Sequence, residues 1–185
     1  RRGFTHLFEH MMFQGWKNAA KEYFTYAEAA GANVREGGVN GTTNQDRTNY
    51  FATVPSGNLE NILWLESDRL QTLPEAMTDA KLANQKDVVR NERRQGLENT
   101  PYGRWFKLIP ENLFPSRHPY ANDVIGVHED LAAATLEDVR DFFRTYYPPN
   151  NLSPVIAGDF DAAAAKRLVE KYFGTIPPGP PLDRP

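Results

Sequence analysis

The sequence predicts an α+β fold. Apolar residues recur at helical spacing in several long segments, as at Leu59, Ile62 and Leu63. Short runs rich in β-branched and aromatic residues lie between these segments, as at Asn49–Val54. Because the helical and extended segments do not alternate strictly, α+β describes the chain better than a parallel α/β sheet.

Seven helices and two strands follow from the periodicity and its boundary signals. The predicted helices cover residues 3–13, 21–30, 58–73, 78–98, 102–113, 135–147 and 162–173. The predicted strands cover residues 49–54 and 152–157, the second as a buried strand. The stretch 37–44 between the second helix and the first strand is rich in glycine and asparagine, which is typical of a turn.

Local residues support these boundaries. The first two helices end near Gly15 and at Gly31, because glycine is favoured just past a helix C-terminus. Pro55 closes the first strand. Thr78 and Thr135 can cap the helices that follow them, since a threonine hydroxyl can accept a hydrogen bond from the first helical turn.

Composition narrows the classes of function. The 185 residues carry a net charge of −3 without a basic stripe, which argues against a nucleic-acid partner. No apolar run approaches 18 residues, so the sequence predicts no membrane span. Because there is no cysteine, a metal site would have to use histidine and carboxylate ligands.

The motif His6-Leu7-Phe8-Glu9-His10 is the strongest functional signal. Two histidines four positions apart lie on one face of a helix, one turn above the other. Such a pair can hold Zn²⁺, with the intervening Glu9 close enough to act as a general base on a water molecule. The order H-x-x-E-H is the inverse of the commoner H-E-x-x-H zinc-protease motif.

A catalytic zinc ion needs a third protein ligand, and Glu92 is the best candidate. It lies on the predicted 78–98 helix, on the face of the apolar stripe that includes Leu82 and Val88. Arg90, Arg93 and Arg94 surround it. Physical reasoning from the sequence therefore leaves two interpretations open, a metal ligand or a surface ion pair with an arginine.

Several segments resemble the insulinase/pitrilysin family of zinc peptidases. They are His6–Gly15 (HLFEHMMFQG), Gly38–Thr43 (GVNGTT), Asp46–Tyr50 (DRTNY), Asp87–Gln95 (DVVRNERRQ), His118–Tyr120, Val124–Gly126 and Val155–Phe160. The resemblance covers nearly the whole chain in the family's order. It implies a metallopeptidase half-domain with a mixed, mainly antiparallel sheet packed against several helices.

The resemblance assigns roles residue by residue. It makes His6, His10 and Glu92 the zinc ligands and Glu9 the catalytic base in peptide-bond hydrolysis. The family commonly has a second glutamate seven residues before the ligand glutamate, and this chain has Gln85 there. A glutamine can still orient a ligand through hydrogen bonds but brings no charge. His118 and His128 are expected to be structural or surface residues.

The family resemblance also implies how substrate is held. Asn40, Gly41, Thr42 and Thr43 would form a sheet edge to which an extended peptide adds as a further strand. Without the resemblance, the same stretch is an ordinary turn before a strand. We expect residues 1–176 to form the catalytic domain, truncated at its start. Residues 177–185 then form a proline-rich linker towards a second homologous domain, in the same chain or in a partner subunit.

Two alternatives to a peptidase share features of this sequence. A lyase that cleaves S-ribosylhomocysteine has a similar helix but depends on cysteine, which this chain lacks. A non-catalytic or incomplete structural subunit of the same family is the more serious alternative, although such subunits usually have an eroded metal motif. The residues around the motif look most like bacterial secreted or periplasmic members, which favours that location.

Overall fold

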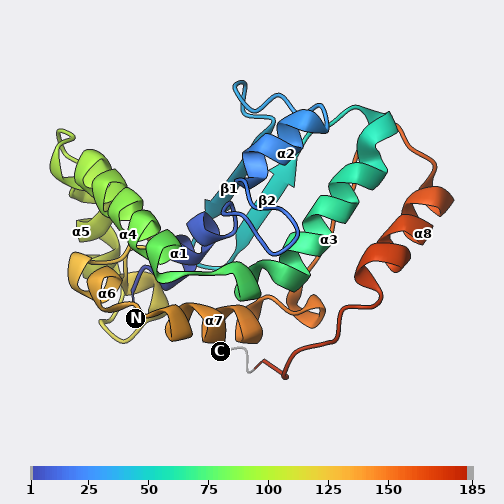
Figure 1. Ribbon diagram of the computed structural model, residues 1–185. Coiled ribbons are helices and arrows are strands. Elements are labelled where there is room, and N and C mark those ends of the chain that lie inside the picture. Colours follow the sequence, from blue (N-terminus) through green and yellow to red (C-terminus); the bar gives the residue numbers. More distant parts are fainter. Residues whose placement is uncertain (1, 183–185) are drawn as a thin grey trace. The chain divides into compact units, whose positions relative to one another are not determined.

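The computed structural model describes residues 2–182. Its helices and strands, in chain order, are α1 (Phe4–Met11), α2 (Tyr23–Ala29), β1 (Val39–Thr43), β2 (Thr48–Ala52), α3 (Leu59–Ala76), α4 (Asp79–Arg93), α5 (Trp105–Leu113), α6 (His128–Ala133), α7 (Leu136–Tyr146) and α8 (Ala162–Phe173) (Figure 1). The strands β1 and β2 form a two-stranded antiparallel sheet. The α+β class is therefore confirmed.

The chain divides into two compact units that interleave along the sequence. The first unit consists of the segment up to Met11, residues 41–49 and residues 78–139. The second unit consists of residues 12–40, 50–77 and the chain from 140 onward. All the predicted site residues except Asn40 belong to the first unit.

In the first unit, α1 packs against α4 (Figure 1). The buried residues of α1 are the apolar Phe4, Leu7, Phe8 and Met11, together with Glu9. The hydroxyl of Thr78 accepts a 3.3 Å hydrogen bond from the Lys81 amide and caps α4, as predicted. The apolar side of α1 therefore sets which of its residues face away from the core.

Two glycines bring the start of α1 against the turn at residues 123–126. Gly3 and Gly126 both have positive φ angles, of 84° and 78°. A Cβ atom on Gly126 would lie 2.5 Å from the Cα of Gly3, which is too close for any side chain. The Gly126 carbonyl also accepts a 2.7 Å hydrogen bond from Nη1 of Arg93, at the end of α4. The Gly3–Gly126 contact thus links the beginning of α1 to the end of α4.

The second unit is built on α3, which packs against α2 and α8. Its most deeply buried charge is Arg69, with no exposed surface. The guanidinium donates to Glu66 Oε2 at 2.6 and 3.0 Å and to the Met12 carbonyl at 3.3 Å. It also lies 3.9 Å from the centre of the Tyr23 ring. A buried cation with this many partners is compensated for the water it has lost.

The helix predictions agree with the structure, with shifted ends. The predicted 78–98 helix consists of α4 followed by one π-helical turn, Arg94–Glu98. The predicted 58–73 helix continues through Pro74 to Ala76. The short α6 was not predicted from the sequence. Among the described residues, no helix combines the length and apolar character needed to cross a bilayer.

The strand predicted at residues 152–157 is wrong. The segment has no ladder partner among the described strands, and Val155 is 87% exposed. Pro154 lacks a backbone N–H, so the segment offers one ladder donor fewer.

The described part of the predicted linker is hydrogen-bonded to Asn150. Its Oδ1 accepts a 2.8 Å hydrogen bond from the Gly179 amide, and its Nδ2 donates to the Gly179 and Pro180 carbonyls at 3.4 and 3.2 Å. Residues 183–185 of that prediction lie outside the described residues.

The glycine contact at Gly126 can be tested by measuring stability. Gly126→Ala should lower the free energy of unfolding by at least about 1 kcal/mol, because it adds a Cβ to a positive-φ residue that touches another backbone. Gly96→Ala is the matched control in the same unit, since Gly96 has open space around it and an ordinary φ. The control should be neutral or stabilising by about 0.5 kcal/mol. Equal urea midpoints for both variants would contradict this role of Gly126.

Candidate metal centre

The two motif histidines project from the same face of α1. His6 and His10 are half-buried, and their ring centroids are 4.8 Å apart in an edge-to-face arrangement. Their neighbours Leu7 and Met11 are buried on the apolar side of the helix. The one-turn spacing predicted from the sequence therefore places two imidazole rings together at the surface of α1.

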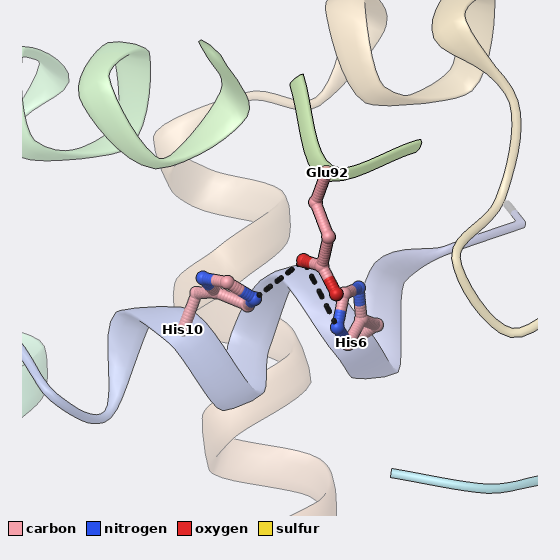
Figure 2. A group of neighbouring side chains, drawn as sticks. All are labelled: His6, His10 and Glu92. Atoms are coloured by element: carbon pink, nitrogen blue, oxygen red, sulfur yellow. Dashed lines mark ion pairs between the residues drawn. The ribbon is translucent and has the colours of Figure 1, made fainter. Parts of the chain in front are cut away.

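Glu92 reaches this pair of rings from α4 (Figure 2). Its Oε2 lies 3.3 Å from Nε2 of His10 and 3.7 Å from Nε2 of His6. The three side chains can offer one ligand atom each, all within 4.8 Å of one another. Two ligand atoms on one tetrahedral zinc ion are about 3.4 Å apart, so these residues fit such an ion. The Glu92 side chain is 48% exposed, so the cluster is open to solvent.

The pKa shifts of His6 and Glu92 favour the forms of these two residues that bind metals. Burial lowers the pKa of His6 and outweighs the attraction of Glu92, which acts in the opposite direction. The hydrogen bond from His10 lowers the pKa of Glu92, and the charge interaction with His6 adds to this effect. A neutral imidazole and an ionised carboxylate are the ligand forms for Zn²⁺.

Glu9 lies between the two histidines in sequence but faces differently. It is only 7% exposed, and its Oε2 accepts a hydrogen bond from the hydroxyl of Thr43. Burial raises the pKa of Glu9, while the Thr43 hydrogen bond and the nearby His10 oppose that rise. Glu9 is not a member of the three-residue cluster. It is thus a buried carboxylate beside His10 in sequence, with its pKa raised by burial above the ordinary value.

One of the two interpretations of Glu92, an ion pair with a neighbouring arginine, can be compared directly with the described contacts. The neighbouring arginines have other partners: Arg90 lies 3.7 Å from Asp87, Arg93 lies 3.7 Å from Glu98, and Arg94 donates to Asn91 at 2.8 Å. The Glu92 carboxylate instead faces the two histidines. The surface ion pair with one of these arginines is therefore not formed.

The buried face of α4 differs in detail from the predicted stripe. Val88 is 40% exposed, whereas Gln85 is buried at 6% exposure, two turns before Glu92. No hydrogen bond joins the Gln85 side chain to the three clustered residues in the described part of the chain. Arg93 completes the buried face, and sequence reasoning gave it no role. Its spacing from Leu82, Gln85 and Val89 was the available signal.

The remaining predicted residues lie elsewhere. His118 Nδ1 accepts a 3.1 Å hydrogen bond from the Tyr120 amide, and His128 Nε2 lies 3.0 Å from Glu98. Both therefore have local partners within the first unit, and neither joins the cluster.

The predicted substrate edge corresponds to β1 and its hairpin with β2. Gly41, Thr42 and Thr43 belong to the first unit, and Asn40 belongs to the second. The Thr42 hydroxyl accepts a 3.1 Å hydrogen bond from Arg47 and bonds to Asn49, away from Glu9. The Thr43 side chain, at the end of this stretch, donates its hydroxyl hydrogen to Glu9.

Two models of one peptidase family and a curated relative match this chain. The family model described as Insulinase (Peptidase family M16) matches residues 1–122, and the one described as Peptidase M16 inactive domain matches residues 133–185. The zinc protease PqqE of Helicobacter pylori is 29% identical over 178 residues, which are 95% of this chain and 38% of that protein. This chain therefore spans well under half the length of that relative.

Solved structures share the fold. The crystal structure of a protease from Helicobacter pylori matches with a TM-score of 0.88 and 27% identity, covering 99% of this chain and 43% of that one. The periplasmic protease PqqL from Escherichia coli matches with a TM-score of 0.82 and 22% identity, covering 99% of this chain and 20% of that one. With a family model spanning residues 1–122, the chain belongs to the insulinase family of peptidases, M16.

Proposed function

We propose that this chain contributes the catalytic half of a zinc endopeptidase that hydrolyses extended or unfolded peptides. The observation that carries the proposal is the convergence of His6, His10 and Glu92, with the buried Glu9 beside them. The similarity to PqqE, a zinc protease, supports the choice of metal and of reaction class.

Each residue has a distinct role in this mechanism. His6, His10 and Glu92 would hold the ion through two Nε2 atoms and one carboxylate oxygen. When bound, zinc supplies Lewis acidity, which activates water and polarises a peptide carbonyl. Glu9 accepts a proton from the attacking water and passes it to the leaving amine. Gln85, buried two turns before Glu92, would support the position of α4 behind the site without adding charge.

The substrate would add as a strand to β1. Asn40, Gly41, Thr42 and Thr43 form most of this strand, which pairs with β2 and lies at an edge of the two-stranded sheet. Main-chain hydrogen bonds would then give affinity with little sequence preference, as suits unfolded peptides.

The complete enzyme is proposed to need more than these residues. The chain spans 38% of the length of PqqE, so a second homologous domain, in the same chain or a partner subunit, would enclose the substrate. Residues 1–176 would form the catalytic domain, and 177–185 would lead to that second domain. A bacterial periplasmic or secreted location is proposed, in line with the periplasmic protease PqqL from Escherichia coli.

Replacing the base should separate catalysis from metal binding. In the complete protease, Glu9→Gln keeps the size of the side chain but removes its basicity. It should lower kcat by about 100-fold or more while one zinc per chain is retained. Zinc analysis and cleavage of an unfolded peptide mixture would measure both. Wild-type turnover by this variant would rule out Glu9 as the base.

Replacing the carboxylate ligand should weaken the metal itself. Glu92→Gln removes the charged ligand, so zinc affinity should fall by more than about 100-fold. Asp87→Asn is the control, because it removes a carboxylate from the exposed side of the same helix. Competition with a chelator would give both affinities. Tight zinc binding by Glu92→Gln would contradict the ligand assignment, and no zinc in the unaltered protein would favour a non-catalytic subunit.

The isolated 185 residues should bind zinc but cleave peptides poorly. Substrate-enclosing groups would come from the second domain, so adding that domain should restore turnover. Comparing cleavage of one peptide mixture with and without the second domain tests this. Efficient turnover by the 185 residues alone would show that they are sufficient.

A further inference from the structure

Two threonine hydroxyls form a chain of hydrogen bonds that ends at the buried carboxylate of Glu9. Thr43, the last residue of β1, donates its hydroxyl hydrogen to Glu9 Oε2. The hydroxyl of Thr48, the first residue of β2, lies 3.0 Å from the hydroxyl of Thr43. All three residues belong to the first unit, so the contacts form within one compact part of the chain.

The chemistry of these groups fixes the direction of both hydrogen bonds. An ionised carboxylate only accepts hydrogen bonds, and a threonine hydroxyl has one hydrogen to donate. Because Thr43 donates to Glu9, its oxygen can only accept from Thr48 in the 3.0 Å contact. The order of donation is therefore Thr48 to Thr43 to Glu9.

The hairpin turn holds the two threonines at this spacing. The Asn44 amide donates to the Arg47 carbonyl at 2.9 Å. The Asn44 side-chain oxygen accepts from the amides of Asp46 and Arg47 at 2.9 and 3.0 Å. Tyr120 donates its phenolic hydrogen to Asp46, which ties the turn to another segment of the same unit. The threonine pair is thus supported by a turn with its own hydrogen bonds.

The hydrogen bond from Thr43 makes the two carboxylate oxygens of Glu9 different from each other. Oε2 of Glu9 accepts the Thr43 hydrogen bond, which draws electron density from that oxygen and makes Oε1 the more basic of the two. A carboxylate free to rotate would present either oxygen at varying angles, and misplacement by about 1 Å can cost about 100-fold in rate. The hydrogen bond from Thr43 to Oε2 restricts this rotation of the Glu9 carboxylate.

We infer that Thr43, supported by Thr48, is a positioning residue that orients Glu9 so that Oε1 is the basic atom. This inference rests on the proposed function, in which Glu9 is the base. It gives the Thr43 side chain a task separate from the strand edge that its backbone would offer to substrate.

The test compares three variants in the complete, zinc-loaded protease. Thr43→Val keeps the shape and removes the hydroxyl, so kcat should fall by about 10- to 100-fold with KM and zinc content unchanged. Thr43→Ser restores the hydroxyl and should return kcat to within about threefold of the wild type. Thr100→Val is the control, because it removes a hydroxyl that bonds the Gln95 carbonyl in the same unit, away from Glu9. It should leave kcat unchanged.

A structural readout accompanies the rates. In a crystal structure of Thr43→Val, the Glu9 carboxylate should be rotated from its wild-type orientation while His6 and His10 stay in place. If Thr43→Val loses its fold or its zinc, Thr48→Val replaces it, since that variant leaves Thr43 intact. Thr48→Val should lower kcat by a smaller factor, of about 3- to 10-fold, because it removes only the supporting bond.

The outcomes separate this inference from the function on which it rests. Wild-type kcat in Thr43→Val, beside an inactive Glu9→Gln, would overturn the positioning role and leave Glu9 as the base. Equal losses of kcat in Thr43→Val and Thr43→Ser would also overturn it, because the hydroxyl would then not be the cause. Full activity in Glu9→Gln would instead overturn the proposed function itself.

Discussion

The close approach of Gly3 and Gly126 is the constraint on which the clustered residues depend. The histidines come from one helix and the glutamate from another, far along the chain. Packing of α1 on α4 brings the helices together, but a metal site tolerates errors of only about 0.5 Å. The glycine contact fixes the start of α1, and the Arg93 hydrogen bond to the Gly126 carbonyl fixes the end of α4 to the same turn. Both α1 and α4, which carry the clustered residues, are therefore held to the same turn at Gly126.

Two adjacent charged residues of α4, Glu92 and Arg93, have different surroundings. Arg93 follows Glu92 directly, yet its side chain is buried and turned to the Gly126 carbonyl and Glu98. Adjacent residues on a helix point about 100° apart, so one can enter the core while the other faces the histidines. If Arg93 paired with Glu92 instead, the carboxylate would have a permanent cationic partner in place of the imidazoles. The geometry of the helix keeps these two charges apart.

Local patterns in the sequence were enough to predict the longer helices, though not the short α6. They also predicted the histidine pair, because the H-x-x-E-H spacing acts within one helical turn. Glu92 required more, since arginines lie close to it in sequence and only the tertiary structure decides which partner it meets. The segment 152–157 has a strand-like composition, but a strand exists only where a ladder partner is present. The hydrogen bond between Thr43 and Glu9 joins residues 34 positions apart, and no local sequence pattern predicts it. Long-range contacts of single side chains are therefore the part of the site that the sequence does not reveal.

The position of Thr43 connects substrate binding with catalysis in the proposed enzyme. Its backbone belongs to the strand on which a peptide would align, and its hydroxyl holds the carboxylate that would act on the peptide bond. A shift of β1 along its own axis would therefore move the bound peptide and the base together. The distance between the peptide and the Glu9 carboxylate would then depend mainly on Thr43. Such a distance varies less than one that depends on the packing of several elements. Thr43 would thus serve both the strand that binds substrate and the base. A hairpin with such a residue benefits from a rigid turn, and the hydrogen bonds of Asn44 supply one.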